Sequence, residues 1–182
     1  MKDRACEMKR ETRETSVSVR LRVDGSGSFE VSTGVPFLDH MAETLARYAS
    51  FDLAAAASGN DEHHVVEDVA ITLGSAFREA LGDGPIERTA TAVVPMDDAL
   101  VSVSVDIIDR PFADIDCPDA LYRHFLRSFA MSARLTLHVV IVRGFDEHHL
   151  VEASFKALGK ALGAASAPRG SELSTKDRAR VG

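Results

Sequence analysis

The heptapeptide Asp-Glu-His-His-Val-Val-Glu at residues 61–67 returns as Asp-Glu-His-His-Leu-Val-Glu at residues 146–152, 85 positions later. Four of the seven histidines lie in these two segments, which we call the cassettes. Apolar residues follow each cassette at helical spacing, so both cassettes are predicted to begin helices. A repeat of this kind favours a fold built from two copies of one unit.

The spacing within a cassette decides which of its side chains can cooperate. Neighbouring residues on a helix diverge by roughly 100°, whereas residues four apart share a face. A histidine and the glutamate four residues later therefore face one ion, and the second histidine points elsewhere. The facing pairs are His63 with Glu67 and His148 with Glu152, and the diverging histidines are His64 and His149. Adjacent imidazoles thus suit two different metals, and such ligands fit Mn, Zn, Fe, Co or Ni.

The rest of the chain reads as two copies of a strand-strand-helix-strand-helix unit. In the first copy, alternating apolar residues predict a hairpin of strands at 16–23 and 29–31 around a turn at 24–27. A helix from about Asp39, a strand at 51–57 and the first cassette helix follow, the last ending at Gly82. In the second copy, we expect strands at 89–94 and 100–107, a helix at 119–132, a strand at 135–142 and the second cassette helix at 146–162.

Composition excludes some classes of protein. Hydrophobic residues at 45% and charged residues at 27% are typical of a globular protein, and a net charge of −7 argues against a nucleic-acid partner. No apolar run approaches the ~20 residues of a membrane span, and the charged N-terminus is not a secretory signal. Cys6 and Cys117 match no zinc or disulfide pattern, which indicates a reducing, cytoplasmic setting.

Other residues are candidates to complete a site. His40 precedes a helical run and His138 interrupts an apolar strand, and both are candidate completing ligands beside the cassettes. With one gap, His40 falls opposite His124 in the second copy, but we assign His124 a structural role. Candidates for binding an anion are Arg88, Arg110, Ser174 and Lys176, because arginine offers a planar fork and lysine a point charge to phosphate.

Six segments together resemble the imidazoleglycerol-phosphate dehydratase family, the lyase of histidine biosynthesis. They are Phe37-Leu38-Asp39-His40-Met41, the cassette at 61–67 with Asp68, Pro95-Met96-Asp97-Asp98-Ala99-Leu100, Asp109-Arg110-Pro111, Thr136-Leu137-His138, and the cassette at 146–152 with Ala153. The resemblance runs from about Arg13 to Lys176, with the motifs in the family's order.

The resemblance implies an α+β fold with an internal duplication of a sheet-plus-two-helix half, related to domain 2 of ribosomal protein S5. A single domain would span residues 1–182, with repeats at about 13–84 and 85–164 and a C-terminal tail at 165–182 contributing to the phosphate site. It also implies two Mn²⁺ per active site and a homo-oligomer of trimers assembled into a 24-subunit shell, with sites shared between subunits. The partner would be a small phosphate ester, with no nucleic acid or membrane involved.

The resemblance further implies roles for particular residues. The metal ligands would be His40, His63, His64, Glu67, His138, His148, His149 and Glu152, and the substrate-binding residues Glu14, His40, Thr44, Tyr48, Arg88, Asp97, Arg110, Lys156, Ser174 and Lys176. The chain departs from the family at Thr44 and Tyr48, where glutamine and histidine are usual, and at Asp109, which replaces a glycine.

The implied reaction dehydrates imidazoleglycerol phosphate to imidazoleacetol phosphate. A substrate imidazolate bound by two metals would help to expel the C3 hydroxyl, and a carboxylate would take the C2 proton. Glu152, Glu14 and Glu67 are the candidate bases, with Glu152 preferred. The alternatives are a dinuclear metallohydrolase, because two metals can also activate water, and a metal-binding shell protein without catalysis.

Overall fold

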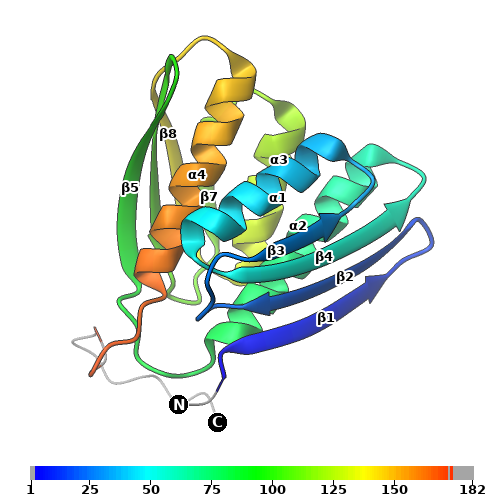
Figure 1. Ribbon diagram of the computed structural model, residues 1–182. Helices are drawn as coiled ribbons and strands as arrows, with labels where there is room; N and C mark the ends of the chain where they lie inside the picture. The colour runs from blue at the N-terminus through cyan, green and yellow to red at the C-terminus, as the bar shows by residue number, and fades with distance from the viewer. Residues whose placement is uncertain (1–2, 172, 174–182) are drawn as a thin grey trace.

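The computed structural model, which describes residues 3–171 and 173, consists of two four-stranded sheets with four helices between them (Figure 1). The first sheet has the order β1-β2-β4-β3 and the second the order β5-β6-β8-β7. The strands are β1 Ala5–Glu11, β2 Thr15–Arg22, β3 Phe29–Ser32, β4 Asp52–Gly59, β5 Thr89–Met96, β6 Ala99–Asp106, β7 Phe112–Ile115 and β8 Thr136–Arg143. The helices are α1 Pro36–Ala49, α2 Glu62–Leu81, α3 Ala120–Ala133 and α4 Glu147–Ala165. The predicted α+β duplication is confirmed.

Each half is a strand-strand-strand-helix-strand-helix unit, one strand longer than predicted. The additional strands, which were not predicted, are β1 in the first half and β7 in the second. The segment Phe29–Ser32 does form a strand, but the predicted hairpin with 16–23 is wrong. β3 pairs in parallel with β4, whereas β2 lies between β1 and β4 and is antiparallel to both. Both edges of β2 are therefore occupied, and none is left for β3.

The two halves repeat one another residue by residue. α1 and α3 have 14 residues each, and each ends at a residue in the left-handed conformation, Ser50 (φ 60°) and Arg134 (φ 54°). His40 and His124 occupy the same position, the fifth residue of their helices. The one-gap alignment of the sequence is thus the structural one.

The helices of one half pack against those of the other. α2 contacts α3 and α1 contacts α4, while α2 also covers β1 and β2, and α4 covers β5 and β6. Gly74 of α2 lies so near α3 that a Cβ there would come within 2.5 Å of the Phe129 carbonyl oxygen. The equivalent Gly159 of α4 is placed alike, with 2.7 Å to the Leu45 carbonyl oxygen. Glycine therefore permits both close helix crossings.

The core between the sheets is apolar and well shielded. Phe51, Phe77, Phe125, Phe129 and Phe155 are all less than 2% exposed. Among the described residues, no helix combines the length and the apolar character needed to cross a membrane.

Candidate metal centre

Each cassette lies at the start of a helix that follows directly from a strand: β4 leads into α2, and β8 leads into α4. Asp61 caps α2 by accepting the backbone N–H of His64 at 3.1 Å. Asp146 caps α4 by accepting the N–H groups of His148 and His149 at 2.9 and 3.3 Å. A carboxylate at this position satisfies free N–H groups and is favoured by the helix dipole. The caps thus fix the backbone that carries the histidines.

The two imidazoles of a cassette face different directions. The ring centroids of His63 and His64 are 6.1 Å apart with planes at 78°, and those of His148 and His149 are 6.0 Å apart at 81°. The rings of one cassette are therefore placed for different partners.

The first half of the centre combines His63 and Glu67 of α2 with His124 of α3. Their ligating atoms all lie within 4.8 Å of one another. His124 Nε2 is 3.1 Å from Glu67 Oε1, and the rings of His63 and His124 stack at 5.0 Å. His124, to which the sequence assigned a structural role, thus lies in a set of three potential metal ligands.

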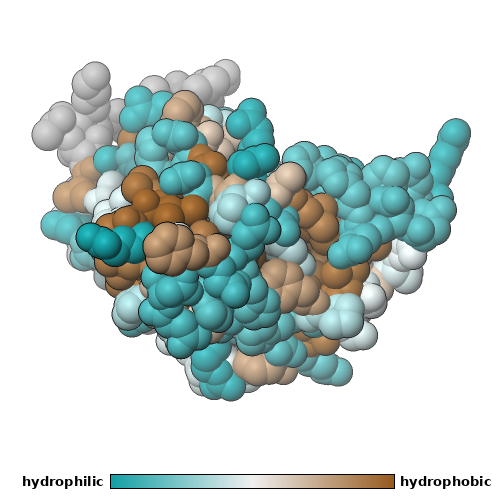
Figure 2. Space-filling model, turned by 90° about the horizontal axis from the view of Figure 1, so that it is seen from above, coloured by the Kyte–Doolittle hydropathy of each residue, from teal (hydrophilic) through white to brown (hydrophobic). Residues whose placement is uncertain are grey.

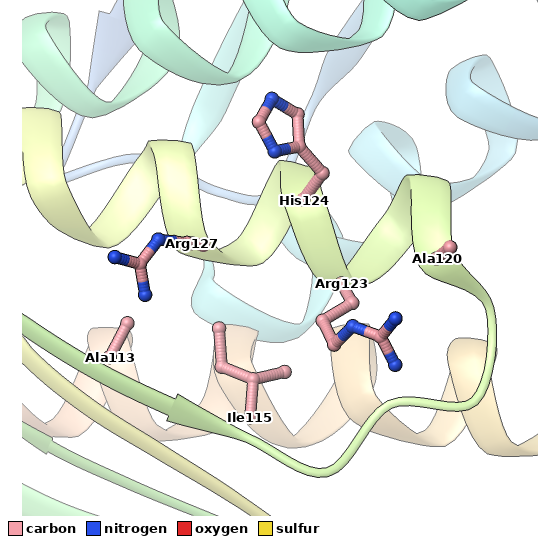
Figure 3. A pocket seen from close by; sticks show the side chains of 6 residues that line it. All are labelled: Ala113, Ile115, Ala120, Arg123, His124 and Arg127. Atoms are coloured by element: carbon pink, nitrogen blue, oxygen red, sulfur yellow. The ribbon is translucent and has the colours of Figure 1, made fainter.

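A close view of α3 shows how His124 is separated from its neighbours on the helix (Figure 3). His124 projects on one side of α3, whereas Arg123 and Arg127 lie toward Ala113 and Ile115 of β7. These residues line a hollow of about 380 Å³. The arginine charges thus lie toward β7, away from the imidazole of His124.

The second half of the centre combines His148 and Glu152 of α4 with His40 of α1. Both imidazoles place Nε2 at 3.6 Å from Glu152 Oε2. The other carboxylate oxygen, Oε1, lies 2.8 Å from Lys156 Nζ. Burial raises the pKa of Glu152, but the hydrogen bond and charge of Lys156, with His40, outweigh it and leave the pKa below its ordinary value. Glu152 is therefore ionised at neutral pH, as a metal ligand must be.

The diverging histidines each meet an acidic side chain from a strand connection. His64 Nδ1 is 3.3 Å from Glu14 Oε2, beside the start of β2. His149 Nδ1 is hydrogen-bonded to Asp98 Oδ1 at 2.6 Å, and its Nε2 is 3.4 Å from Asp97 Oδ2. The hydrogen bond that His149 donates to Asp98 raises the pKa of His149, and the same bond lowers the pKa of Asp98 to about 2.

His138 is not brought to either cassette in this chain. It lies on β8 between Leu137 and Val139, which are buried in the core, so its side chain faces the opposite side of the sheet. Its neighbours there are Asp114, with Nδ1 to Oδ2 at 3.9 Å, and the ring of Phe112 at 5.5 Å. The alternation of side chains along the strand already predicts that His138 faces away from Leu137 and Val139.

The donor set and its unsatisfied atom fit divalent metals. Imidazole nitrogen and carboxylate oxygen are ligands for first-row transition ions. His124 Nε2 is a buried atom without a hydrogen bond in the described part of the chain, although Glu67 Oε1 lies 3.1 Å away. Buried polar atoms normally have partners, and a bound cation would supply one here.

The predicted substrate residues are placed unevenly. Tyr48 is 37% exposed, and Lys156 Nζ lies 5.7 Å from the centroid of its ring. Thr44, by contrast, is buried. Asp97 adopts a left-handed backbone (φ 47°) in the turn between β5 and β6, which directs its carboxylate to His149.

Arg88 of the predicted phosphate group lies where the chain crosses from α2 to β5. Its Nε is 2.8 Å from Asp106 Oδ1, and its Nη1 donates to the backbone carbonyl of Leu173 at 3.0 Å. Ser174 and Lys176 lie outside the described residues.

Arg110 follows Asp109, the residue that stands where the family has glycine. Asp109 has a φ of 61°, a left-handed conformation in which glycine is unstrained. Its Oδ1 lies 2.6 Å from Arg78 Nη1 and 2.7 Å from Arg134 Nε, and both arginines contribute to lowering its pKa. Two ion pairs therefore hold the backbone conformation that a glycine would adopt freely.

Comparisons with known proteins identify the family and its fold. The imidazoleglycerol-phosphate dehydratase family matches residues 33–162. The imidazoleglycerol-phosphate dehydratase of Dehalococcoides mccartyi is 47% identical over 173 residues, covering 89% of this chain and 88% of that protein. The crystal structure of the Pyrococcus furiosus enzyme superposes with a TM-score of 0.84 at 39% identity, covering 92% of this chain and 98% of that one. The Staphylococcus aureus enzyme gives 0.80 at 30% identity, with 91% and 99% covered. The chain therefore belongs to the imidazoleglycerol-phosphate dehydratase family of enzymes.

Proposed function

We propose that this enzyme dehydrates D-erythro-imidazoleglycerol phosphate to imidazoleacetol phosphate in histidine biosynthesis, at a centre that holds two divalent metal ions. The observation that carries the proposal is the pair of repeat-related clusters, His63-Glu67-His124 and His148-Glu152-His40, in a chain of this family. The metals, which we propose to be Mn²⁺, would act as Lewis acids that stabilise the imidazolate form of the substrate ring.

We propose His124 as an addition to the ligand set, because it lies with His63 and Glu67. His138 faces the other side of the second sheet, beside Asp114, and we keep it as a proposed ligand to a metal shared with a neighbouring copy. His64 and His149 complete the set. Their rings diverge from the clusters of their own chain, so we propose that they serve metals shared with neighbouring copies.

Assembly into an oligomer is supported by the surface beside the second cassette. Phe145, which precedes the cap Asp146, is 93% exposed, and Val140 and Val142 of β8 are about half exposed. Hydrophobic side chains also form patches among hydrophilic ones on the face shown in Figure 2. Exposed apolar clusters mark contact surfaces. We propose trimers assembled into a 24-subunit shell in the cytoplasm, with active sites between subunits.

Three glutamates are candidates for the base that takes the C2 proton of the substrate. Glu152 is our choice for the base that takes the C2 proton, because Lys156 fixes one of its oxygens and keeps it ionised. Glu67 is a second candidate, and one of its oxygens, Oε1, lies 3.1 Å from His124 Nε2. Glu14, whose side chain is 56% exposed, has fewer constraints and remains the alternative. Replacing the residue that acts as the base by its carboxamide, glutamate by glutamine, should abolish turnover. The variant should keep its bound metal only if that residue is not also a metal ligand.

Positively charged side chains and a serine hydroxyl would hold the phosphate away from the reacting bond and so orient the substrate. We propose Arg88, Arg110, Ser174 and Lys176 for this role. Arg88 already contacts the carbonyl of Leu173, so the tail that carries Ser174 begins at this site.

The test is to assay the purified protein with Mn²⁺ and imidazoleglycerol phosphate and to measure the alkaline absorbance of the enolised ketone product. EDTA should remove the activity, and Mn²⁺ should restore it. Release of inorganic phosphate without ketone would favour the metallohydrolase, and tight metal binding without turnover would favour the shell protein.

A second measurement separates the two candidate histidines. His124→Ala should lower the metal content and remove turnover, because one cluster loses a ligand. His138→Ala should lower the metal content of the assembled protein, because His138 would bind a metal shared between copies. Full metal content in either variant would remove that histidine from the ligand set.

A further inference from the structure

The connection between β5 and β6 holds the loop before the second cassette. Asp98 accepts the backbone N–H groups of Phe145 and Asp146 with Oδ2, at 2.6 and 3.2 Å. Its other oxygen, Oδ1, is 2.6 Å from Nδ1 of His149. One carboxylate thus ties together the strand connection, the start of α4 and one imidazole.

This contact selects one tautomer of the imidazole. An ionised carboxylate has only acceptor oxygens, so Nδ1 of His149 must donate the hydrogen bond to Asp98. In the neutral ring the lone pair then resides on Nε2, which lies 3.4 Å from Asp97 Oδ2 and is the nitrogen that can bind a cation.

The first half contains the counterpart. Glu14 immediately precedes β2 as Asp98 immediately precedes β6, and Glu14 Oε2 lies 3.3 Å from Nδ1 of His64. The same nitrogen of the equivalent histidine therefore faces a carboxylate in both repeats. In the second half, however, the carboxylate is also anchored by two backbone donors.

We propose that Asp98 is a positioning residue: it fixes the orientation and tautomer of His149 so that Nε2 is presented to the metal. The inference rests on the proposed role of His149 as a metal ligand. Carboxylates that hold the second nitrogen of a ligating histidine typically account for 10- to 100-fold in metal affinity.

Asp98→Asn separates this role from simple anchoring of the loop. The amide oxygen can still accept the N–H groups of Phe145 and Asp146, so the loop should stay in place. The amide NH₂ must then donate to Nδ1 of His149, which moves the ring proton to Nε2 and blocks coordination. Asp98→Ala removes the anchor but leaves either tautomer open.

The experiment measures Mn²⁺ dissociation constants by competition with a fluorescent chelator, and the unfolding of the metal-free proteins in urea. We expect Asp98→Asn to weaken Mn²⁺ binding about 10- to 100-fold with little change in unfolding. Asp98→Ala should unfold more easily yet bind Mn²⁺ no worse than Asp98→Asn, and Asp98→Glu should recover part of the affinity. Asp24→Asn, which makes the same charge change beside Arg4, is the control and should bind normally.

Parent-like Mn²⁺ affinity in Asp98→Asn would overturn the proposal, as would an affinity loss that follows the loss of stability, largest in Asp98→Ala. His149→Ala distinguishes the ligand role of His149 from the positioning role of Asp98. If His149→Ala binds Mn²⁺ normally, the ligand assignment of the proposed function is wrong. If His149→Ala loses Mn²⁺ while the Asp98 variants do not, only the positioning role is wrong.

Discussion

The β1–β2 hairpin that carries Glu14 is held to α2 by one buried carboxylate, and its removal tests how the first half of the site is supported. Asp68 Oδ1 accepts from Arg10 Nε at 2.7 Å, and Oδ2 accepts from the hydroxyl of Thr15. The side chain of Asp68 is 10% exposed, whereas that of Arg10 is 41% exposed. The repeat-related residue of α4 is Ala153, so alanine is compatible with the helix at this position.

Asp68→Ala should therefore lower the free energy of unfolding by about 2–3 kcal/mol, since the bond from Thr15 to this charged group contributes about 1.5–3 kcal/mol and the pair with half-exposed Arg10 less than about 1 kcal/mol. The full loss expected of a buried ion pair is not reached, because water can solvate the half-exposed guanidinium of Arg10. For a chain of this length, the change should lower the melting temperature by about 4–12 °C.

Urea denaturation of Asp68→Ala, Thr15→Val and the double variant measures the coupling between the two side chains. The double variant should lose less than the sum of the single losses, because Thr15→Val removes the hydroxyl that has lost its acceptor. Arg20→Ala is the control: its pair with Glu7 is solvent-exposed and should contribute less than about 1 kcal/mol. A loss in Asp68→Ala no larger than that of the control, or strict additivity, would refute this account.

Three further predictions concern the helix crossings, acid stability and the thiols. Gly74→Ala should destabilise by about 1–3 kcal/mol, because the added Cβ would meet the Phe129 carbonyl at 2.5 Å; the control Ser75→Ala should change little, and a higher melting temperature in Gly74→Ala would contradict the packing. The pKa of Asp52 is held well below its ordinary value, mainly by the backbone N–H of Ser26. The contribution of ionised Asp52 to the free energy of unfolding is therefore fully present above roughly pH 3.9 and is lost as the pH falls through the lower pKa of the folded state. In Asp52→Asn, the free energy of unfolding measured in urea should thus decrease less on acidification than in the parent. An equal decrease in both proteins would argue against this role of Asp52. Burial raises the pKa of Cys117 to about 11, so its thiol should react with Ellman's reagent only after unfolding; reaction in the native protein would show that it is accessible.

Long elements with strong local signals were predictable from the sequence. The four helices and the strands β2, β4, β5, β6 and β8 have regular apolar spacing, and Gly82 ends α2 where predicted. β1 was missed because charged residues alternate with Cys6 and Met8 on an edge strand, and β7 because it has only four residues. The false β2–β3 hairpin has a different origin, since the insertion of β4 between them is decided by tertiary pairing.

The candidate site was only partly predictable, because local spacing is readable from the sequence whereas contacts between elements depend on tertiary packing. The helical period placed the first histidine of each cassette with the glutamate four residues later, but it does not tell which other helix approaches that face. His124 reaches His63 only because α3 packs on α2. The alignment of the two repeats already indicated that His124 is equivalent to His40. The alternation of buried and exposed residues along β8 already indicated that His138 faces away from the core of its own chain. Asp98 could be found only once the β5–β6 connection and α4 were seen together.

The crossed packing of α1 on α4 and of α2 on α3 also has a consequence for folding and ancestry. A single repeat would expose the helix surfaces that the other repeat now covers, including the faces around Gly74 and Gly159. Neither half is then an independent folding unit, and the chain should unfold in one cooperative step. Two separate copies of an ancestral repeat would have covered each other in the same way. Gene fusion would have turned the interface of such a homodimer into the interior of one chain, and each half became free to change residues such as Asp68 and Ala153 independently.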